Sequence, residues 1–480
     1  MKKVLALCLA LFVLAQITAC GGDSNTPPID STDDVTTVTD AEPVDMTYVC
    51  ELPEDVKFPG ETFTFTIYEN PNVNNFMLAE EETGDTIDDA KVKRQRLVEE
   101  RLELKIEEVV FALENWNASP LRRVILSGDC YFDVANISCT DAITFWEEGL
   151  VTPASDLPYI DIEKGYWNKD FNKSLTLDGK QYVAIGDMLT STLDLTYALT
   201  FNKKLAEDYK IGDIYSLVRE GKWTFDQMFT MMKTATSDAN GDSKMDINDN
   251  YGYSAHVKQV LPAFWISAGE MSVKKDDHDI PYLAIGEEGF IDVLNRVFTI
   301  CYDEGTYYKA SGLNDVTDDQ VKLFTENKLL FMDASFFYMQ RLRTMETDFG
   351  IIPYPKADEN QERYYSRVSY YNAPIVPVTN KDLEKTGAVL EYFNYVSHST
   401  VIPAYCDVVL YGKITRDEES RDMLNLIFDS RVVDIGDTTL CANIRDGVFM
   451  SMFESNNRNV ASVVPTLTSV IEQFVADIPQ

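Results

Sequence analysis

The sequence predicts an α/β protein with more than one domain. Over residues 63–137, apolar strand patterns alternate with amphipathic helix patterns, an order that is typical of a parallel sheet covered by helices. The chain has 480 residues, of which 45% are hydrophobic, enough for two or more domains with hydrophobic cores. We find no internal repeat that would indicate a solenoid or a propeller instead.

The N-terminus has the pattern of an export signal. Two lysines precede an apolar run over residues 4–15, which is too short to span a bilayer. The sequence ITAC at residues 17–20 resembles a lipobox, in which cleavage before Cys20 leaves a diacylated N-terminus. We therefore expect residues 1–19 to be a lipoprotein signal peptide. Cys20 would then anchor the protein to the extracytoplasmic face of the cell membrane. The alternative is an ordinary signal peptide with an incidental cysteine.

The segment after the signal and the overall charge are both acidic. Residues 20–54 contain no Lys or Arg, which predicts a flexible acidic tether. The formal net charge is −37, and removal of Lys2 and Lys3 with the signal lowers it by two more charges to −39. Such a surface repels nucleic acid and anionic lipid, so we expect no nucleic-acid partner.

The first folded segment contains three predicted strands. We expect strands over 63–68, 104–111 and 132–137, separated by helices over 88–103 and 120–127. In parallel sheets, ligands bind beyond the carboxyl ends of the strands. The loops after the first and third strands therefore become candidate cleft loops, and their candidate ligand residues are Glu69, Asn70 and Asp141.

The middle of the chain repeats the alternation of strand and helix. A strand is predicted over 195–201 and a short helix over 203–209. Thr224 is an N-cap candidate for a second helix, because an apolar stripe at helical spacing follows it.

An acidic loop after that helix has the spacing of a calcium site. Oxygen ligands at loop positions 1, 3, 5, 7, 9 and 12 are typical of such loops. The corresponding residues here are Asp238, Asn240, Asp242, Lys244, Asp246 and Asp249. Ser243 stands at position 6, where such loops usually have Gly, and Asp249 is shorter than the usual Glu. We expect one structural Ca²⁺ here and no organic cofactor. The alternative is an Asn/Asp/Gly turn that only water solvates.

Several short motifs occur in the order found in a known family. They are FNK at 201–203, KWT at 222–224, the acidic loop at 238–246, YG at 251–252, FTENKLLFM at 324–332 and FGIIPYPK at 349–356. Together, behind a lipobox, they resemble the extracellular solute-binding proteins, family 1, which are the sugar-type substrate-binding subunits of ABC importers. Asn327 stands where the family has Gly, and the segment 184–187 lacks the family's usual Pro.

The resemblance implies a two-lobed periplasmic-binding-protein fold of type II. Each lobe would be a mixed sheet flanked by helices, and crossover hinge strands would join the lobes. The implied bounds are 55–184 with 375–415 for the first lobe, and 185–374 with 416–480 for the second. The implied function is to capture a carbohydrate, specifically an oligosaccharide, and deliver it to the permease subunits of an ABC transporter. We expect a monomer.

The resemblance also implies which side chains face the ligand. Aromatic rings cover the flat faces of sugars, and the candidates for stacking are Trp265, Phe336, Phe337 and Tyr338. Each of them has the alternative of being a core residue. Asp187 lies where a hinge strand would face the cleft, with a solvated turn as the alternative.

The cysteines leave their pairing open. Cys8 lies in the signal, and six more follow Cys20: Cys50, Cys130, Cys139, Cys301, Cys406 and Cys441. Export permits disulfides, although free buried thiols are equally compatible with a chain of this length.

Two other classes of function compete with import. One is a cell-surface glycan-binding protein that is not coupled to import. The other is a glycoside hydrolase that depends on carboxylates, because many Asp and Glu residues are present. The chain has no HExxH, GxSxG or P-loop pattern and has three His, so we predict that it is not an enzyme.

Overall fold

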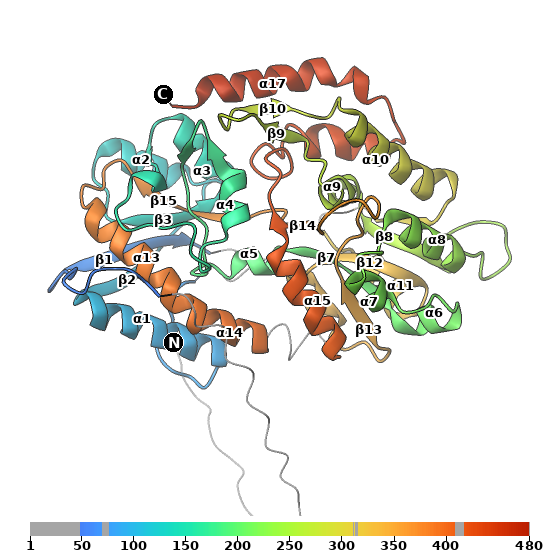
Figure 1. Ribbon diagram of the computed structural model, residues 1–480, viewed down its shortest axis with the longest axis horizontal. Coiled ribbons are helices and arrows are strands. Elements are labelled where there is room, and N and C mark those ends of the chain that lie inside the picture. The colour runs from blue at the N-terminus through green and yellow to red at the C-terminus, as the bar shows by residue number, and fades with distance from the viewer. Residues whose placement is uncertain (1–48, 70–75, 311, 313–314, 409–416, 480) are drawn as a thin grey trace, which may run out of the picture. The chain divides into compact units, whose positions relative to one another are not determined.

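Two mixed β-sheets, each flanked by helices, organise the chain (Figure 1). The computed structural model describes residues 49–69, 76–310, 312, 315–408 and 417–479. Both sheets have five strands, in the orders β2-β1-β3-β15-β4 and β11-β8-β12-β7-β13. We call the first sheet with its helices lobe 1 and the second sheet with its helices lobe 2. Both lobes belong to one compact unit.

Lobe 1 combines the first part of the chain with a later return. Its strands are β1 (Thr62–Tyr68), β2 (Lys105–Phe111), β3 (Val134–Ser138), β4 (Val151–Thr152) and β15 (Asn372–Pro377). Its helices are α1 (Thr86–Leu102), α2 (Ser119–Ser127), α3 (Cys139–Glu147), η1 (Ala154–Asp156), α13 (Leu383–Ser399) and α14 (Val401–Tyr405). The strand β1 pairs in parallel with β2 and β3, whereas β15 runs antiparallel to β3 and β4.

Lobe 2 holds the second sheet. Its strands are β7 (Tyr197–Asn202), β8 (Tyr251–His256), β11 (Tyr307–Ala310), β12 (Leu329–Ser335) and β13 (Phe349–Ile352). The strands β11, β8 and β12 are parallel, and β7 and β13 are antiparallel to their neighbours. Small additional strands are β9 (Val273–Lys275), β10 (Pro281–Leu283), β14 (Ser366–Arg367) and β16 (Arg431–Val432).

The helices of lobe 2 include two π-helices. The α-helices are α6 (Lys203–Asp208), α7 (Ile214–Arg219), α8 (Phe225–Ala235), α9 (Val257–Ser267), α10 (Glu288–Phe298), α11 (Asp318–Thr325), α12 (Phe336–Met339), α15 (Glu418–Asp429), α16 (Met450–Glu454) and α17 (Val464–Asp477). The π-helices are η2 (Thr299–Asp303) and η5 (Arg445–Phe449), and the short turns are η3 (Gln340–Leu342) and η6 (Val460–Ser462).

Short elements carry the chain between the lobes. They are α4 (Lys169–Leu175), β5 (Thr176–Leu177), β6 (Lys180–Gln181) and α5 (Ser191–Asp194) on the outward path. The return path runs from β14 to β15, and the hydroxyl groups of Tyr182 and Tyr371 lie 3.0 Å apart where the two paths meet. The strand β15 begins at Asn372, so the predicted lobe boundary at residue 374 falls inside a strand.

Alternating side chains of β1 enter different cores. Phe63, Phe65 and Ile67 are buried against α1 and α13, which lie side by side on that face (Figure 1). Tyr68 joins the core on the opposite face. This is the period of two that a strand imposes, and it explains why the strand was predictable from its pattern.

Local side-chain chemistry sets several helix ends. The side chain of Asp85 accepts hydrogen bonds from the backbone N–H groups of Ile87 and Asp88, which starts α1 two residues before the predicted position. Asn327, which replaces the family's Gly, has φ of 59°. Asn tolerates the left-handed conformation better than other side chains, so the turn before β12 is retained. Within the described residues, no helix combines the length and apolarity needed to cross a bilayer.

Candidate functional site

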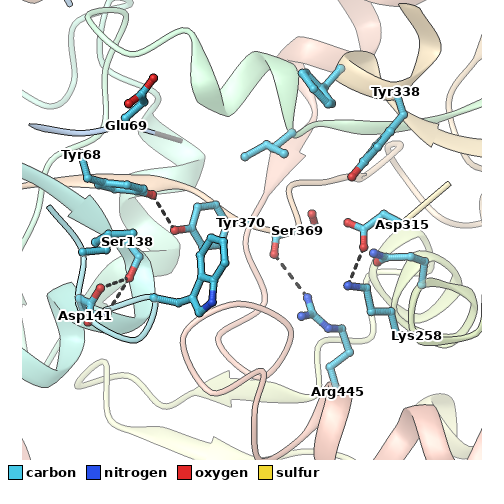
Figure 2. Close-up of a pocket in the computed structure, with 15 residues that line it drawn as sticks. Tyr68, Glu69, Ser138, Asp141, Lys258, Asp315, Tyr338, Ser369, Tyr370 and Arg445 are labelled. Atoms are coloured by element: carbon cyan, nitrogen blue, oxygen red, sulfur yellow. Dashed lines mark hydrogen bonds and ion pairs between the residues drawn. The ribbon is translucent and has the colours of Figure 1, made fainter. Parts of the chain in front are cut away.

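A pocket of about 290 Å³ lies where strands of both sheets end. Residues from lobe 1, from lobe 2 and from the return path between β14 and β15 line it (Figure 2). The lining residues are Tyr68, Glu69, Leu113, Trp116, Ser138, Asp141, Leu195, Lys258, Gln259, Asp315, Phe337, Tyr338, Ser369, Tyr370 and Arg445. The volume is near the lower end of the range for small-molecule sites.

The parallel strands of lobe 1 bring one set of polar groups together. Glu69 directly follows β1, and Ser138 ends the neighbouring strand β3. The Ser138 hydroxyl donates to a carboxylate oxygen of Asp141 at 2.7 Å and accepts from the Asp141 backbone N–H. Asp141 lies in the first turn of α3, where the helix dipole favours its negative charge.

Tyrosine hydroxyls form the centre of the lobe 1 side. The hydroxyl oxygens of Tyr68 and Tyr370 are 2.9 Å apart, and Tyr68 donates to the side-chain oxygen of Asn372 at 2.7 Å (Figure 2). Burial raises the pKa of Tyr370 well above its usual range. The Tyr370 hydroxyl therefore stays protonated at neutral pH and serves as a hydrogen-bonding group.

Trp116 is the most unusual aromatic residue of the lining. It occupies the tight turn between β2 and α2, closed by the bridge between Glu114 and Asn117. Both central residues have positive φ, 52° at Asn115 and 64° at Trp116, and 84% of Trp116 is exposed. A bulky residue with positive φ is strained, and such strain concentrates at functional sites. The turn thus holds an indole ring in solvent at the pocket.

An ion pair forms the lobe 2 side. The ammonium group of Lys258, in the first turn of α9, lies 2.5 Å from a carboxylate oxygen of Asp315 (Figure 2). Tyr197 donates to the other oxygen at 3.0 Å. Burial raises the pKa of Asp315, but Lys258 and Tyr197 outweigh it, so this pKa lies below its ordinary value. Asp315 is therefore ionised and already paired.

Arg445 lies at the base of the pocket, where the π-helix η5 begins. It donates to the Ser369 carbonyl oxygen at 3.4 Å and the Asp437 carbonyl oxygen at 2.8 Å, and it pairs with the carboxylate of Asp446 at 2.7 Å. Asp437 also accepts two hydrogen bonds from the buried Arg367. These contacts fix Arg445 and compensate its charge. The widened turn of a π-helix is a common feature of functional sites.

Only part of the predicted ligand set lines the pocket. Glu69, Asp141, Phe337 and Tyr338 do so, and Asn70 lies outside the described residues. Asp187 does not line it, and its carboxylate instead pairs with the ring of His398 at 2.6 Å.

Trp265 and Phe336 lie in the hydrophobic core. A core position was the alternative expected for each of the aromatic candidates. Both side chains have 0% exposure, and neither lines the pocket. Trp265 packs against Phe290 and Phe449, and its indole N–H donates to Asp434 at 2.8 Å. Phe336 packs against Phe428. The expectation that these two rings face the ligand is therefore corrected.

Five of the lining residues described above were not predicted from the sequence: Trp116, Lys258, Asp315, Tyr370 and Arg445. Trp116 had a partial signal, because the Asn residues on both sides of it, between a strand and a helix, favour a turn. The other four lie far apart in the chain, and only folding brings them together.

The carboxylates of the acidic loop form backbone hydrogen bonds. Asp238 accepts from the N–H groups of Gly241 and Ser243, at 2.6 and 2.7 Å. Asp249 accepts from Ala239 and Asp246, and hydrogen bonds from the Asp246 N–H and other backbone groups lower the pKa of Asp249. In the described part of the chain, no group of three or more His, Cys, Asp or Glu side chains is arranged to hold a metal ion.

The six cysteines after Cys20 are all free thiols. Cys139 and Cys301 are buried, and burial raises the pKa of Cys139 to about 12. A thiol with such a pKa stays protonated at neutral pH and is therefore unreactive.

The comparisons with known proteins identify the fold. No family model and no curated protein matches the sequence. Among solved structures, the ABC substrate-binding protein Lmo0181 from Listeria monocytogenes in complex with cycloalternan matches with a TM-score of 0.52 and 12% identity, covering 87% of this chain and 99% of that one. The chain has the fold of ABC-transporter sugar-binding proteins.

Two further solute-binding structures agree. A cyclo/maltodextrin-binding protein complexed with maltotetraose gives a TM-score of 0.56 at 13% identity, covering 88% of this chain and 97% of that one. The galacto-N-biose-/lacto-N-biose I-binding protein of the ABC transporter from Bifidobacterium longum gives 0.55 at 12% identity, covering 88% and 98%. The predicted two-lobed, type II periplasmic-binding-protein fold is confirmed. At identities this low, the structural matches establish the fold alone. The ligand therefore has to be argued from the pocket itself.

Proposed function

We propose that this protein binds a carbohydrate outside the membrane as the substrate-binding subunit of an ABC importer. The observation that carries the proposal is a pocket that combines aromatic rings with ionised and hydroxyl groups, at the strand ends of a solute-binding fold. Sugars present flat C–H faces and a rim of hydroxyls, which such a mixture of side chains complements. The proposal involves binding and release and includes no catalytic step.

The side chains have distinct roles in this proposal. Trp116 stacks on a sugar face, because its ring is held in solvent at the pocket. Asp141 and Glu69 accept hydrogen bonds from hydroxyls, while Tyr370 donates one. Because Lys258 and Asp315 of lobe 2 also line the pocket, a ligand that contacts both lobes favours a closed arrangement by hinge motion.

Titration calorimetry with a panel of saccharides tests this function. We expect at least one saccharide to bind, and we expect Trp116→Ala to weaken that binding about tenfold or more, since one aromatic stacking partner contributes more than 1 kcal/mol at a buried contact. Tyr282→Ala is the matched control, because Tyr282 is an exposed ring on β10 outside the pocket. Failure of every saccharide to bind would contradict the function, and hydrolysis of a bound one would identify an enzyme instead.

Delivery to a permease and lipid anchoring are further parts of the proposal. Cys20 and the tether lie outside the described residues, so support comes from the signal and lipobox sequence. Labelling with radioactive palmitate tests the anchor. We expect label on the wild type and none on Cys20→Ser, and an unlabelled wild type would rule the anchor out.

We also propose that the loop 238–249 binds one structural Ca²⁺. The support is the spacing of its oxygen side chains. An ion that binds only the folded state of a protein raises the melting temperature of that protein. We therefore expect Ca²⁺ to raise the melting temperature of the wild type and chelation to lower it. No change on chelation would contradict this site.

A further inference from the structure

A second, much smaller cavity of about 10 Å³ lies between α1, α14 and the segment that leads out of lobe 1. Its lining includes Lys91 and Arg94 of α1, Val401 of α14 and residues 188–191 of that segment. The helices α1 and α14 lie side by side (Figure 1). A cavity of this volume has room for about one water molecule. It shares no lining residue with the larger pocket between the lobes.

Three polar side chains of this lining carry donor groups without an acceptor. In the described part of the chain, Ser191 Oγ and Arg94 Nε are buried and form no hydrogen bond. The ammonium group of Lys91 forms no hydrogen bond to any described residue either, and its side chain is only 4% exposed. A buried N–H or O–H group without an acceptor is costly. An acceptor inside the cavity would therefore stabilise the fold.

These three side chains surround one small space. Lys91 and Arg94 are three residues apart, so they share one face of α1. Arg94 also donates to the carbonyl oxygen of Met188 at 3.3 Å, which places it next to the segment that contains Ser191. Because the cavity has room for only one small particle, a particle inside it lies against all three side chains.

Neither cation of the lining has a close counter-charge. Arg94 is 0% exposed, donates to the Ser397 hydroxyl at 3.0 Å and lies 4.1 Å from the ring centroid of Phe393, and no carboxylate pairs with it in the described part of the chain. Lys91 has one carboxylate partner, Asp88, at 3.8 Å. Burial lowers the pKa of Arg94 to about 9, and burial and then repulsion by Arg94 lower the pKa of Lys91. Both shifts have the direction expected for a buried cation without a close anion.

Three other carboxylates act on these cations only from a longer distance. Glu108 accepts a backbone N–H at 2.8 Å, Asp85 caps the start of α1, and Asp194 accepts a tyrosine hydroxyl at 2.5 Å. None of the three forms an ion pair with Lys91 or Arg94 among the described residues. The protein therefore leaves the charge inside this cavity largely uncompensated.

We propose that this cavity binds one monatomic anion, which would be chloride in the natural setting. A water molecule has too few lone pairs for three donors and supplies no negative charge. An oxyanion such as sulfate is too large for the volume. A halide accepts hydrogen bonds from several donors at once, and those from cations are the strong ones. Bound there, it would connect α1 of lobe 1 to the segment that leads towards lobe 2.

Crystallography in the presence of bromide tests the site directly. Bromide replaces chloride and is located by its anomalous scattering. We expect a peak in the cavity of the wild type, within hydrogen-bond distance of Lys91 Nζ, and no peak there in Lys91→Met. A wild-type cavity without a bromide peak would overturn the inference.

Melting temperatures at constant ionic strength provide a second test. At about 0.1 M salt, chloride should raise the melting temperature by about 1–3 °C relative to gluconate, which is too large for the cavity, because only an ion that fits binds the folded state. Screening is equal in the two salts and does not contribute to this difference. Equal melting temperatures of the wild type in both salts would overturn the inference.

Variants assign the halide effect to the cavity. Lys91→Met should abolish the difference between chloride and gluconate, and Ser191→Ala should reduce it. Lys93→Met is the matched control, because Lys93 is an exposed lysine of the same helix outside the cavity, and it should keep the full difference. If Lys91→Met and Lys93→Met respond alike to chloride, the ion binds elsewhere and the proposed site is wrong.

Discussion

Trp116 and Trp265 illustrate how the environment of a single residue determines its role. Trp116 is 84% exposed on a strained turn, and Trp265 is 0% exposed in the core. The sequence alone gave Trp265 a place in the ligand site, because its position matched the family. In the structure, Trp116 lines the pocket, whereas the ring of Trp265 packs against Phe290 and Phe449.

Trp265→Ala should therefore lower stability. It removes a buried ring and leaves Asp434 without the indole donor, so we expect a loss of about 3–5 kcal/mol in the free energy of unfolding. Trp116→Ala should change that free energy by less than about 0.5 kcal/mol, because the residue is exposed. Chemical denaturation measures both. Equal stability of the two variants would contradict this assignment.

Asp333 is a buried carboxyl group whose state depends on pH. It is 0% exposed, and Tyr354 donates to one of its oxygens at 2.5 Å. Burial raises the pKa of Asp333 to about 7, from an ordinary value of 3.8. Between these values, the folded protein holds a proton that the unfolded chain has lost, so Asp333 makes stability fall as the pH rises from about 4 to about 7.

Asp333→Asn should remove this contribution. The variant cannot ionise, so its stability relative to the wild type should increase by roughly 4 kcal/mol between pH 4 and pH 7, and should then stay level. Denaturation across that pH range measures the difference. A difference that does not change with pH would show that Asp333 titrates normally. Asp194, whose pKa burial raises to about 6, contributes the same trend to both proteins.

At the scale of elements, the close contact between β8 and α8 explains why the YG motif requires its glycine. Gly252 is the glycine of the YG pair, and its strand is fully buried. A Cβ atom there would lie 2.4 Å from the backbone Cα of Met232 in α8. This glycine, part of the family resemblance, therefore has a packing role, because it lets the helix approach the sheet.

Gly252→Ala should push α8 away from the sheet. We expect a loss of about 1–3 kcal/mol in the free energy of unfolding, which is typical of overpacking. Gly286→Ala is the control, because its nearest atom, in Val464, would be at an ordinary 3.9 Å. Thermal or chemical denaturation of both variants is the measurement. If Gly252→Ala is as stable as the control, the contact is not tight in solution.

At the scale of the whole molecule, cores and charge act over both lobes. One hydrophobic cluster includes Trp146 of lobe 1 and Phe449 of lobe 2, so the lobes share buried surface near their crossover. The formal net charge is −37, and the excess negative side chains repel one another more strongly in the folded state than in the expanded chain. Salt should therefore affect the stability of the whole protein.

Raising NaCl from about 0.01 to about 0.15 M should increase the melting temperature, because the Debye length falls from roughly 30 to roughly 8 Å. Differential scanning calorimetry without divalent cations measures the effect. A melting temperature that falls with salt would mean that attractive ion pairs outweigh the repulsion.

The fold was largely predictable from the sequence, and the site was predictable only in part. Hydrophobic periodicity and capping are local, so strands such as β1 and helices such as α1 and α2 lie within a few residues of their predicted bounds. Glu69 and Asp141 were predictable because they follow parallel strands, whose ends meet at one edge by geometry. Arg445 and Ser369 were not, because no local pattern relates residues so distant in the chain.

The sequence by itself determined the α/β class, the order of the motifs, the acidic charge and the loops at the ends of the first strands. The tertiary structure decided which aromatic rings are exposed and which cations are already compensated. The physical reason is that periodicity is a property of neighbouring residues, whereas exposure and charge compensation depend on contacts between segments that only the folded chain brings together.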